Sequence, residues 1–274
     1  MAVNRNVNAQ QSIERSVQVQ MPGDIDAAHT GCQALHLHAV PQSPTLFDEP
    51  ILNMMQQAAL GLDSVACSQA VKDALAAGIA AEDIADHYIP EISRRLGDDW
   101  CNDELGFGPV TIAGARLQFM LRELGPDWSG DKAADPDAPT ILLIVPRNAH
   151  HTLGAMVLAG QMRRKGFSVR VLLDANSHEI AECVRRSIYD AVFISATPGE
   201  TLESLRLIVR FIKSSSAQEI PVVIGGSLID LETGQKLAVK TGADYATKSP
   251  EEALELCGLR AKTRNSAIRP VRGT

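Results

Sequence analysis

The sequence has little of what marks several large classes of protein. Aromatic residues make up only 4% of the 274 residues, which argues against a surface that stacks nucleic-acid bases. The five cysteines are scattered and form no C-x-x-C pair, so neither a zinc knuckle nor a disulfide framework is indicated. No apolar run approaches the length of a membrane span, and the N-terminus lacks the apolar core of a signal peptide. We therefore expect a cytoplasmic protein without membrane contact.

Charge and length set further limits. The formal net charge of -7 makes the chain as a whole a poor binder of DNA or of anionic membrane. Hydrophobic residues reach 45%, enough for a sizeable core, and the length allows two ordinary domains. Residues 1–47, rich in Gln, Asn, Ser, Pro and Asp, predict a disordered leader. Residues 259–274 are basic and carry no acid, which predicts a tail for weak DNA contact, for an acidic partner or for solubility.

Residues 48–125 have a helical pattern. Apolar residues recur three or four positions apart in four short stretches, which predicts a small four-helix bundle. The third stretch contains Pro90, which should bend the helix, and it is expected to end near Gly97. Residues 126–139 contain Pro, Gly, Ala and Asp without periodicity and are predicted to be a linker.

From Thr140 short apolar runs alternate with amphipathic stretches. Five βα units imply an α/β fold, a doubly wound five-stranded parallel sheet within residues 140–258. Right-handed crossovers bring the loops after the first, third and fourth strands to one edge of the sheet. Strands are predicted at 141–145, 168–173, 191–195, 221–225 and 243–247, and helices at 151–165, 178–187, 200–214, 228–241 and 250–256.

Three common functions of doubly wound sheets lack their motifs here. The loop after the first strand, PRNAHHTLG, has neither the G-x-G-x-x-G of a dinucleotide site nor the sequence of a phosphate-binding P-loop. Arg147, Asn148 and Ser195 stand where a phospho-acceptor receiver would need carboxylates to hold its metal.

The same edge does carry residues suited to a bulky ligand. A histidine can coordinate a metal through a neutral imidazole nitrogen, and a hydroxyl at a strand end can hydrogen-bond a ring nitrogen. Glycines permit close backbone approach of a ligand. Each residue alone is common at a turn, but their joint placement at three loops predicts a binding site. The residues are His150, His151, Thr152, Gly154, Ser195, Thr197, Gly225 and Gly226.

These loops resemble the motifs of the cobalamin-binding domain family, which are D-x-H-x-x-G, then S-x-L or S-x-T, then G-G. The matching stretches are AHHTLG at 149–154, SAT at 195–197 and GG at 225–226. The family carries a four-helix cap before the sheet, and GDDW at 97–100 is similar to the G-x-x-W signature of that cap. The resemblance covers about residues 48–256.

The resemblance implies how a cobalamin would be held. His151, favoured over His150 by its spacing to the motif glycine, would ligate cobalt from below. The displaced dimethylbenzimidazole tail would lie between the first strand's helix and the sheet. Ser195 and Thr197 would line that channel, and the glycine pair would leave room for it. Trp100 would cover the upper face of the corrin from the cap.

Two departures from the family's pattern narrow the function. Ala149 replaces the acid that normally holds the other imidazole nitrogen, which counts against a mutase or a methyltransferase. Val110 and Thr111 replace the Glu-His pair of the photoreceptor repressors, and no winged helix precedes the bundle. Residues 98–125 are most similar to the AerR/PpaA group, the cobalamin-binding antirepressors of photosynthesis genes in purple bacteria.

That resemblance implies a non-enzymatic, light-responsive regulator. It would bind hydroxocobalamin or a light-cleaved alkylcobalamin and relieve a repressor of photosynthesis and tetrapyrrole genes by protein–protein contact. Three alternatives stay open at this point. One is a haem-binding redox sensor, because haem iron also takes a histidine ligand. The others are a corrinoid methyl-carrier module of an enzyme and a two-domain fold whose ligand site has decayed.

Overall fold

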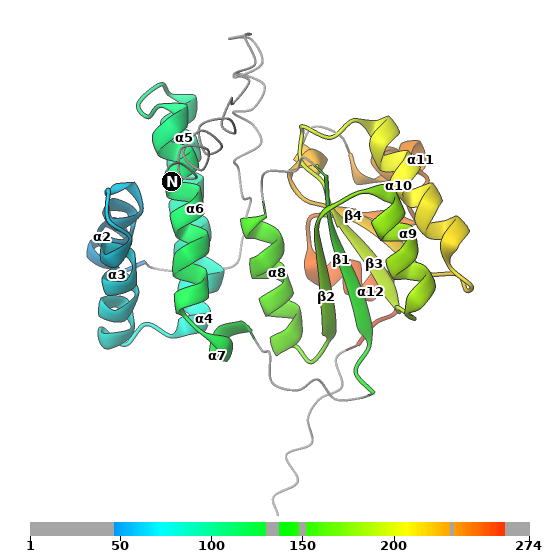
Figure 1. Ribbon diagram of the computed structural model, residues 1–274, viewed down its shortest axis with the longest axis horizontal. Helices are drawn as coiled ribbons and strands as arrows, with labels where there is room; N and C mark the ends of the chain where they lie inside the picture. Colours follow the sequence, from blue (N-terminus) through cyan, green and yellow to red (C-terminus); the bar gives the residue numbers. More distant parts are fainter. Residues whose placement is uncertain (1–46, 130–136, 148–151, 231–232, 261–274) are drawn as a thin grey trace, which may run out of the picture.

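The computed structural model describes residues 47–129, 137–147, 152–230 and 233–260 (Figure 1). A helical cap is followed by an α/β part, as predicted. His150 and His151, the leader up to residue 46 and the tail from residue 261 lie outside the described residues.

Four main helices make the cap: α2 (Glu49–Leu60), α3 (Ser64–Ala76), α5 (Ile89–Cys101) and α6 (Phe107–Glu123). Asp48 and Asp63 fix the starts of α2 and α3, because their carboxylates accept hydrogen bonds from backbone N–H groups of the first turn. The buried sides of the helices meet in one core that includes Leu52, Met55, Ile92, Leu117 and Met120.

The predicted irregularity at Pro90 takes the form of a π-helical turn. A short helix, α4 (Ala81–Asp83), runs into the π turn η2 (Ile84–Tyr88), which leads directly into α5. Proline has no N–H to continue the ladder of hydrogen bonds, and the N–H of Ile89 bonds to the carbonyl of Ile84, five residues back.

The predicted helix end near Gly97 is wrong, because α5 continues to Cys101. The stop comes at Asp103, whose φ of 59° is left-handed. The N–H of Glu104 then bonds to the carbonyl of Asp99 at 2.8 Å, which closes the helix end. Trp100 therefore lies on the last turn of a helix rather than in a loop.

The sheet has five parallel strands in the order β2-β1-β3-β4-β5, which confirms the doubly wound prediction. The order reverses between β1 and β3, and ligands bind at such a point outside the carboxyl ends of the strands. The strands are β1 (Thr140–Pro146), β2 (Ser168–Ala175), β3 (Ala191–Ser195), β4 (Val222–Gly225) and β5 (Tyr245–Ala246).

Helices cover both faces of the sheet. On one face lie α8 (Leu153–Arg164) and α12 (Pro250–Leu256), and on the other lie α9 (Ser177–Arg186), α10 (Leu202–Ser215) and α11 (Gly234–Thr241). The predicted helix at 228–241 is divided into a 3-10 turn, η3 (Ser227–Asp230), and α11. β1 is buried between the two layers, which explains its unbroken apolar run.

Helix α8 lies between the sheet and the cap (Figure 1). Ala155 and Met162 pack on the sheet, while Leu153 and Val157 belong to the core of the cap. The two parts of the chain therefore share one helix as their common wall.

The segment predicted as a linker begins with a short helix, α7 (Pro126–Ser129). Trp128 on this helix is only 5% exposed, and its ring lies against Gly160 of α8. The guanidinium of Arg164 donates a hydrogen bond to the carbonyl of Trp128. The docked indole thus accounts for the position of α7, which the sequence does not reveal through any periodicity.

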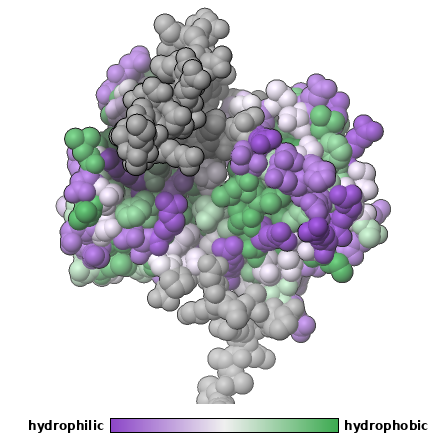
Figure 2. Space-filling model, in the orientation of Figure 1, coloured by the Kyte–Doolittle hydropathy of each residue, from purple (hydrophilic) through white to green (hydrophobic). Residues whose placement is uncertain are grey.

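The outer strand β2 is apolar at the surface. Leu173 is 45% exposed, and Figure 2 shows apolar side chains gathered on this face in the region of β2. Arg163 donates to the carbonyl of Val169 at 2.9 Å and so occupies part of the strand's backbone. Among the described helices, none has both the length and the apolar character needed to cross a membrane.

Candidate functional site

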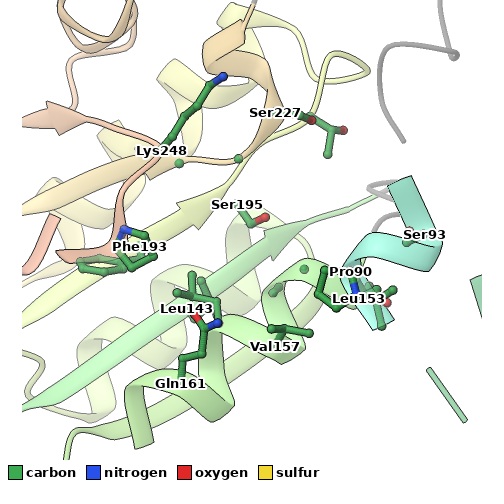
Figure 3. Close-up of a pocket in the computed structure, with 18 of the residues that line it drawn as sticks. Pro90, Ser93, Leu143, Leu153, Val157, Gln161, Phe193, Ser195, Ser227 and Lys248 are labelled. Carbon is green, nitrogen blue, oxygen red and sulfur yellow. The ribbon is translucent and has the colours of Figure 1, made fainter. Parts of the chain in front are cut away.

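A cavity of about 770 Å³ opens between the cap, α8 and the carboxyl edge of the sheet (Figure 3). Its volume lies in the range of ligand sites, about 300–1,000 Å³. The structure brings seven of the expected residues to its wall, while His150 and His151 lie outside the described residues. The seven are Trp100, Thr152, Gly154, Ser195, Thr197, Gly225 and Gly226.

The cap contributes an aromatic and apolar wall. The rings of Trp100 and Phe107 lie 6.0 Å apart at 55°, and Phe107 is 67% exposed. Val110, Thr111 and Gly114 continue the wall along α6. The sequence analysis did not single out Phe107. Its spacing could have indicated its place, because a residue four positions before Thr111 lies on the same face of the helix.

The cavity is also lined by side chains of α8 and of the sheet. Leu143 of β1, Phe193 of β3 and Val223 of β4 line it from the sheet. Val157 and Gln161 line it from α8, and Figure 3 shows these α8 side chains together with Leu143 and Phe193. The walls are apolar, with the amide of Gln161 as a polar group among them. This is the position that the family resemblance implies for a lower-base tail.

Ser195 and Thr197 differ in what they can offer a ligand. The side chain of Ser195 stands at the end of β3 on the cavity wall (Figure 3). The hydroxyl of Thr197 donates to the carboxylate of Glu200 at 2.8 Å, and the N–H of Thr197 donates to the same oxygen. Thr197 thus has only acceptor capacity left, and Ser195 is the better donor to a ring nitrogen.

Glu200 is a further residue that sequence reasoning missed. Burial raises the pKa of its carboxyl group, and the hydrogen bonds from Thr197 counteract this. The N–H of Glu200 also bonds to the carbonyl of Thr197 at 3.0 Å. The side chain of Glu200 therefore stabilises the turn after β3. The spacing T-x-x-E of Thr197 and Glu200 could have indicated this contact in the sequence.

The glycine pair after β4 has a backbone role. Gly226 has a φ of +96°, and a Cβ there would lie 2.3 Å from the carbonyl oxygen of Ala196. At Gly225 a Cβ would lie 3.3 Å from the carbonyl oxygen of Thr247. The glycines were expected to leave room for a ligand. The structure shows that they let neighbouring loops approach each other.

The start of α8 is tied to the cap. Gln118 of α6 donates from its amide to the hydroxyl of Thr152 at 2.9 Å. Thr152 occupies the N-cap position but makes no side-chain cap hydrogen bond. The first turn of α8, including Gly154, lines the cavity beside the undescribed residues 148–151.

Asp86 and His87 on the π turn reach the same cavity. His87 is half-buried and lines the cavity beside Asp86. The carboxylate of Asp86 pairs with Arg164 of α8. Burial raises the pKa of Asp86 and the Arg164 guanidinium counteracts it; Oδ1 has no hydrogen-bond partner among the described residues.

The metal chemistry of the described residues is limited. No group of three His, Cys, Asp or Glu side chains among them could hold a metal ion. The histidine pair in the loop after β1 lies outside the described residues and is not covered by this statement.

The comparisons agree with this geometry. Residues 139–257 match the B12 binding domain family. A 20.5 kDa protein of Rhodobacter capsulatus, named as uncharacterized and as lying in the bchF-crtJ intergenic region, is 35% identical over 172 residues. That match covers 63% of this chain and 88% of the relative.

Two solved structures are also similar. The monomethylamine corrinoid protein of Methanosarcina barkeri superposes with a TM-score of 0.58 at 17% identity, covering 77% of this chain and 98% of that one. A cobalamin-binding protein of Desulfitobacterium hafniense gives a TM-score of 0.39 at 22% identity, covering 76% and 97%. The first of these likenesses shows a shared fold. The chain belongs to the B12-binding domain family, and residues 139–257 are its cobalamin-binding domain.

Proposed function

We propose that this protein is a cobalamin-dependent, light-responsive regulator that relieves a repressor of photosynthesis genes by protein–protein contact. The observation that carries the proposal is the convergence of the cap tryptophan, the hydroxyl loop and the glycine pair on one cavity. The relative encoded between bchF and crtJ supports the regulatory setting. Hydroxocobalamin, or an alkylcobalamin cleaved by light, is the proposed cofactor.

The proposed site residues have separate tasks. His151, in the loop after β1, is the proposed cobalt ligand, and His150 and Thr152 flank it. Ser195 would donate a hydrogen bond to the lower base, and the apolar side chains of β1, β3 and β4 would exclude water from it. Trp100, joined by Phe107, would pack against the macrocycle from the cap. When bound, the cofactor supplies a light-sensitive cobalt–carbon bond or an exchangeable upper ligand.

The proposed mechanism is a shift in how the cap sits on the sheet domain. A ligand in this cavity touches both parts, so it favours whichever arrangement gives it the better contacts. The Gln118–Thr152 hydrogen bond and the Asp86–Arg164 ion pair join the two parts beside the cavity and would respond to such a shift. The altered cap surface would then bind the repressor. Weak DNA contact through the basic tail is a subsidiary proposal.

The test loads the full chain with adenosylcobalamin in the dark and compares it with an illuminated sample. We expect a change of corrin absorbance on illumination and a change in binding to a photosynthesis-gene repressor. A Soret band with hemin and no response to corrinoids would replace the proposal with a haem sensor. Methyl transfer from bound methylcobalamin to a thiol would replace it with a methyl carrier in an enzyme.

A further inference from the structure

Lys248 is the only lysine or arginine among the described residues that line the cavity. It belongs to the loop between β5 and α12. Figure 3 shows its side chain extending along the loops at the cavity, on the same side as Ser227, the residue that follows the glycine pair. Ser227 and Ser249 add hydroxyl groups to this corner of the wall.

Two other acidic side chains on the cavity wall form ion pairs with cations that do not line the cavity. Asp86 pairs with Arg164, and Glu251 pairs with Lys165, and neither of these cations is among the lining residues. An anion that enters the cavity would therefore face carboxylates there, with no cation of the described wall to balance its charge except Lys248.

Lys248 is paired with Asp230 in the structure, and both side chains are partly exposed to solvent. The side chains of Lys248 and Asp230 are 39% and 26% exposed, so solvent screens the pair and its strength is modest. An ammonium group has three donors, so it can keep one contact with Asp230 and make another with a bound anion.

The position of this corner suggests which anion. Residues of the loops after β4 and β5 form this corner, and they line the same cavity as the apolar side chains of β3 and β4. A cobalamin carries its lower base on a chain that contains one phosphodiester. If the base lay between α8 and the sheet, this anion would lie outside the apolar part of the cavity, because burying an unpaired charge there is costly. We infer that Lys248 holds this phosphodiester, an inference that rests on the proposed function.

The experiment measures the affinity of the full chain for two corrinoids by absorbance titration. Hydroxocobalamin has the phosphodiester and the lower base, whereas aquocobinamide has the corrin without either. Lys248→Met should weaken hydroxocobalamin binding about tenfold, because a charge-assisted contact is lost at a partly exposed site. Its affinity for aquocobinamide should change less than about twofold. Lys248→Arg, which keeps the charge, should bind both as the native chain does.

The matched control is Lys165→Met. Lys165 also pairs with a carboxylate on the wall and is 44% exposed, but it is not a lining residue. It should leave both affinities unchanged. A salt series supplies a second readout: raising NaCl from about 50 to about 500 mM should weaken hydroxocobalamin binding to the native chain but not to Lys248→Met.

The outcomes separate the inference from the function. If the native chain binds neither corrinoid, the proposed function fails. If it binds hydroxocobalamin but Lys248→Met binds both corrinoids as tightly as before, or weakens both equally, the function stands and the role of Lys248 is refuted. Cobinamide phosphate gives a further comparison. The native chain should bind it more tightly than aquocobinamide, and Lys248→Met should bind the two with equal affinity.

Discussion

The indole ring of Trp128 occupies the space that a side chain at Gly160 would need. A Cβ at Gly160 would lie 2.4 Å from Cζ3 of the ring, so helix α7 and helix α8 fit together only because residue 160 has no side chain. The contact fixes the end of the cap against the helix that carries the cavity wall.

Gly160→Ala should therefore destabilise the protein by about 1–3 kcal/mol, because overpacking outweighs the gain in helix propensity. The control is Gly114→Ala on α6, where a Cβ meets nothing within 4 Å and alanine should be neutral or stabilising. Urea unfolding followed by circular dichroism measures both. Equal effects at the two glycines would show that Trp128 does not restrict position 160.

Gly226→Ala should cost more than Gly78→Ala. Both glycines have a left-handed φ, +96° and +91°, but a Cβ at Gly78 meets nothing, whereas one at Gly226 meets the carbonyl of Ala196 at 2.3 Å. We expect about 1 kcal/mol for Gly78→Ala from backbone strain alone, and at least about 3 kcal/mol for Gly226→Ala. Thermal unfolding gives the comparison, and a smaller loss at Gly226 would contradict the close loop contact.

Glu200→Gln should change how stability depends on pH. The folded-state pKa of Glu200 is raised above its ordinary 4.5 by burial, so the protonated form favours folding. That contribution is complete below about pH 4.5 and is lost as pH rises through the raised pKa. The neutral glutamine avoids this loss and can still accept from Thr197.

The stability of Glu200→Gln relative to the native chain should thus increase from about pH 4.5 to pH 8. Urea unfolding at several pH values measures the difference. Glu200→Ala serves as the control that removes the acceptor together with the charge. Its stability should follow the same pH trend relative to the native chain, and should lie about 1–2 kcal/mol below that of Glu200→Gln at every pH. A pH-independent difference between Glu200→Gln and the native chain would mean that the carboxyl group titrates normally.

Cys257 should react slowly with iodoacetamide. Burial, with a smaller contribution from Asp244, raises the pKa of its thiol to about 11, so little thiolate is present at pH 8. Alkylation followed by peptide mass spectrometry should be at least about tenfold slower in the native protein than in urea. Equal rates in the two conditions would contradict the burial.

The sequence predicts the fold well because its strongest signals are local. The apolar run of β1 and the helix–strand alternation after it follow from burial on two sides of a parallel sheet. Helix α7 escaped prediction because its order comes from Trp128 meeting Gly160, a contact between distant residues. The motif loops could be placed at one edge because parallel strands end together. The roles of Glu200, Phe107 and Lys248 could not be predicted, because each depends on neighbouring side chains that the spacing in the sequence does not reveal.

The most direct measurement is a titration of the purified chain with hydroxocobalamin, followed by the absorbance of the corrin, for the native protein, His151→Ala and His150→Ala. The account predicts a shifted spectrum with the native protein and with His150→Ala, and loss of that shift with His151→Ala. An unshifted spectrum with the native chain, or the same shifted spectrum with His151→Ala, would contradict it.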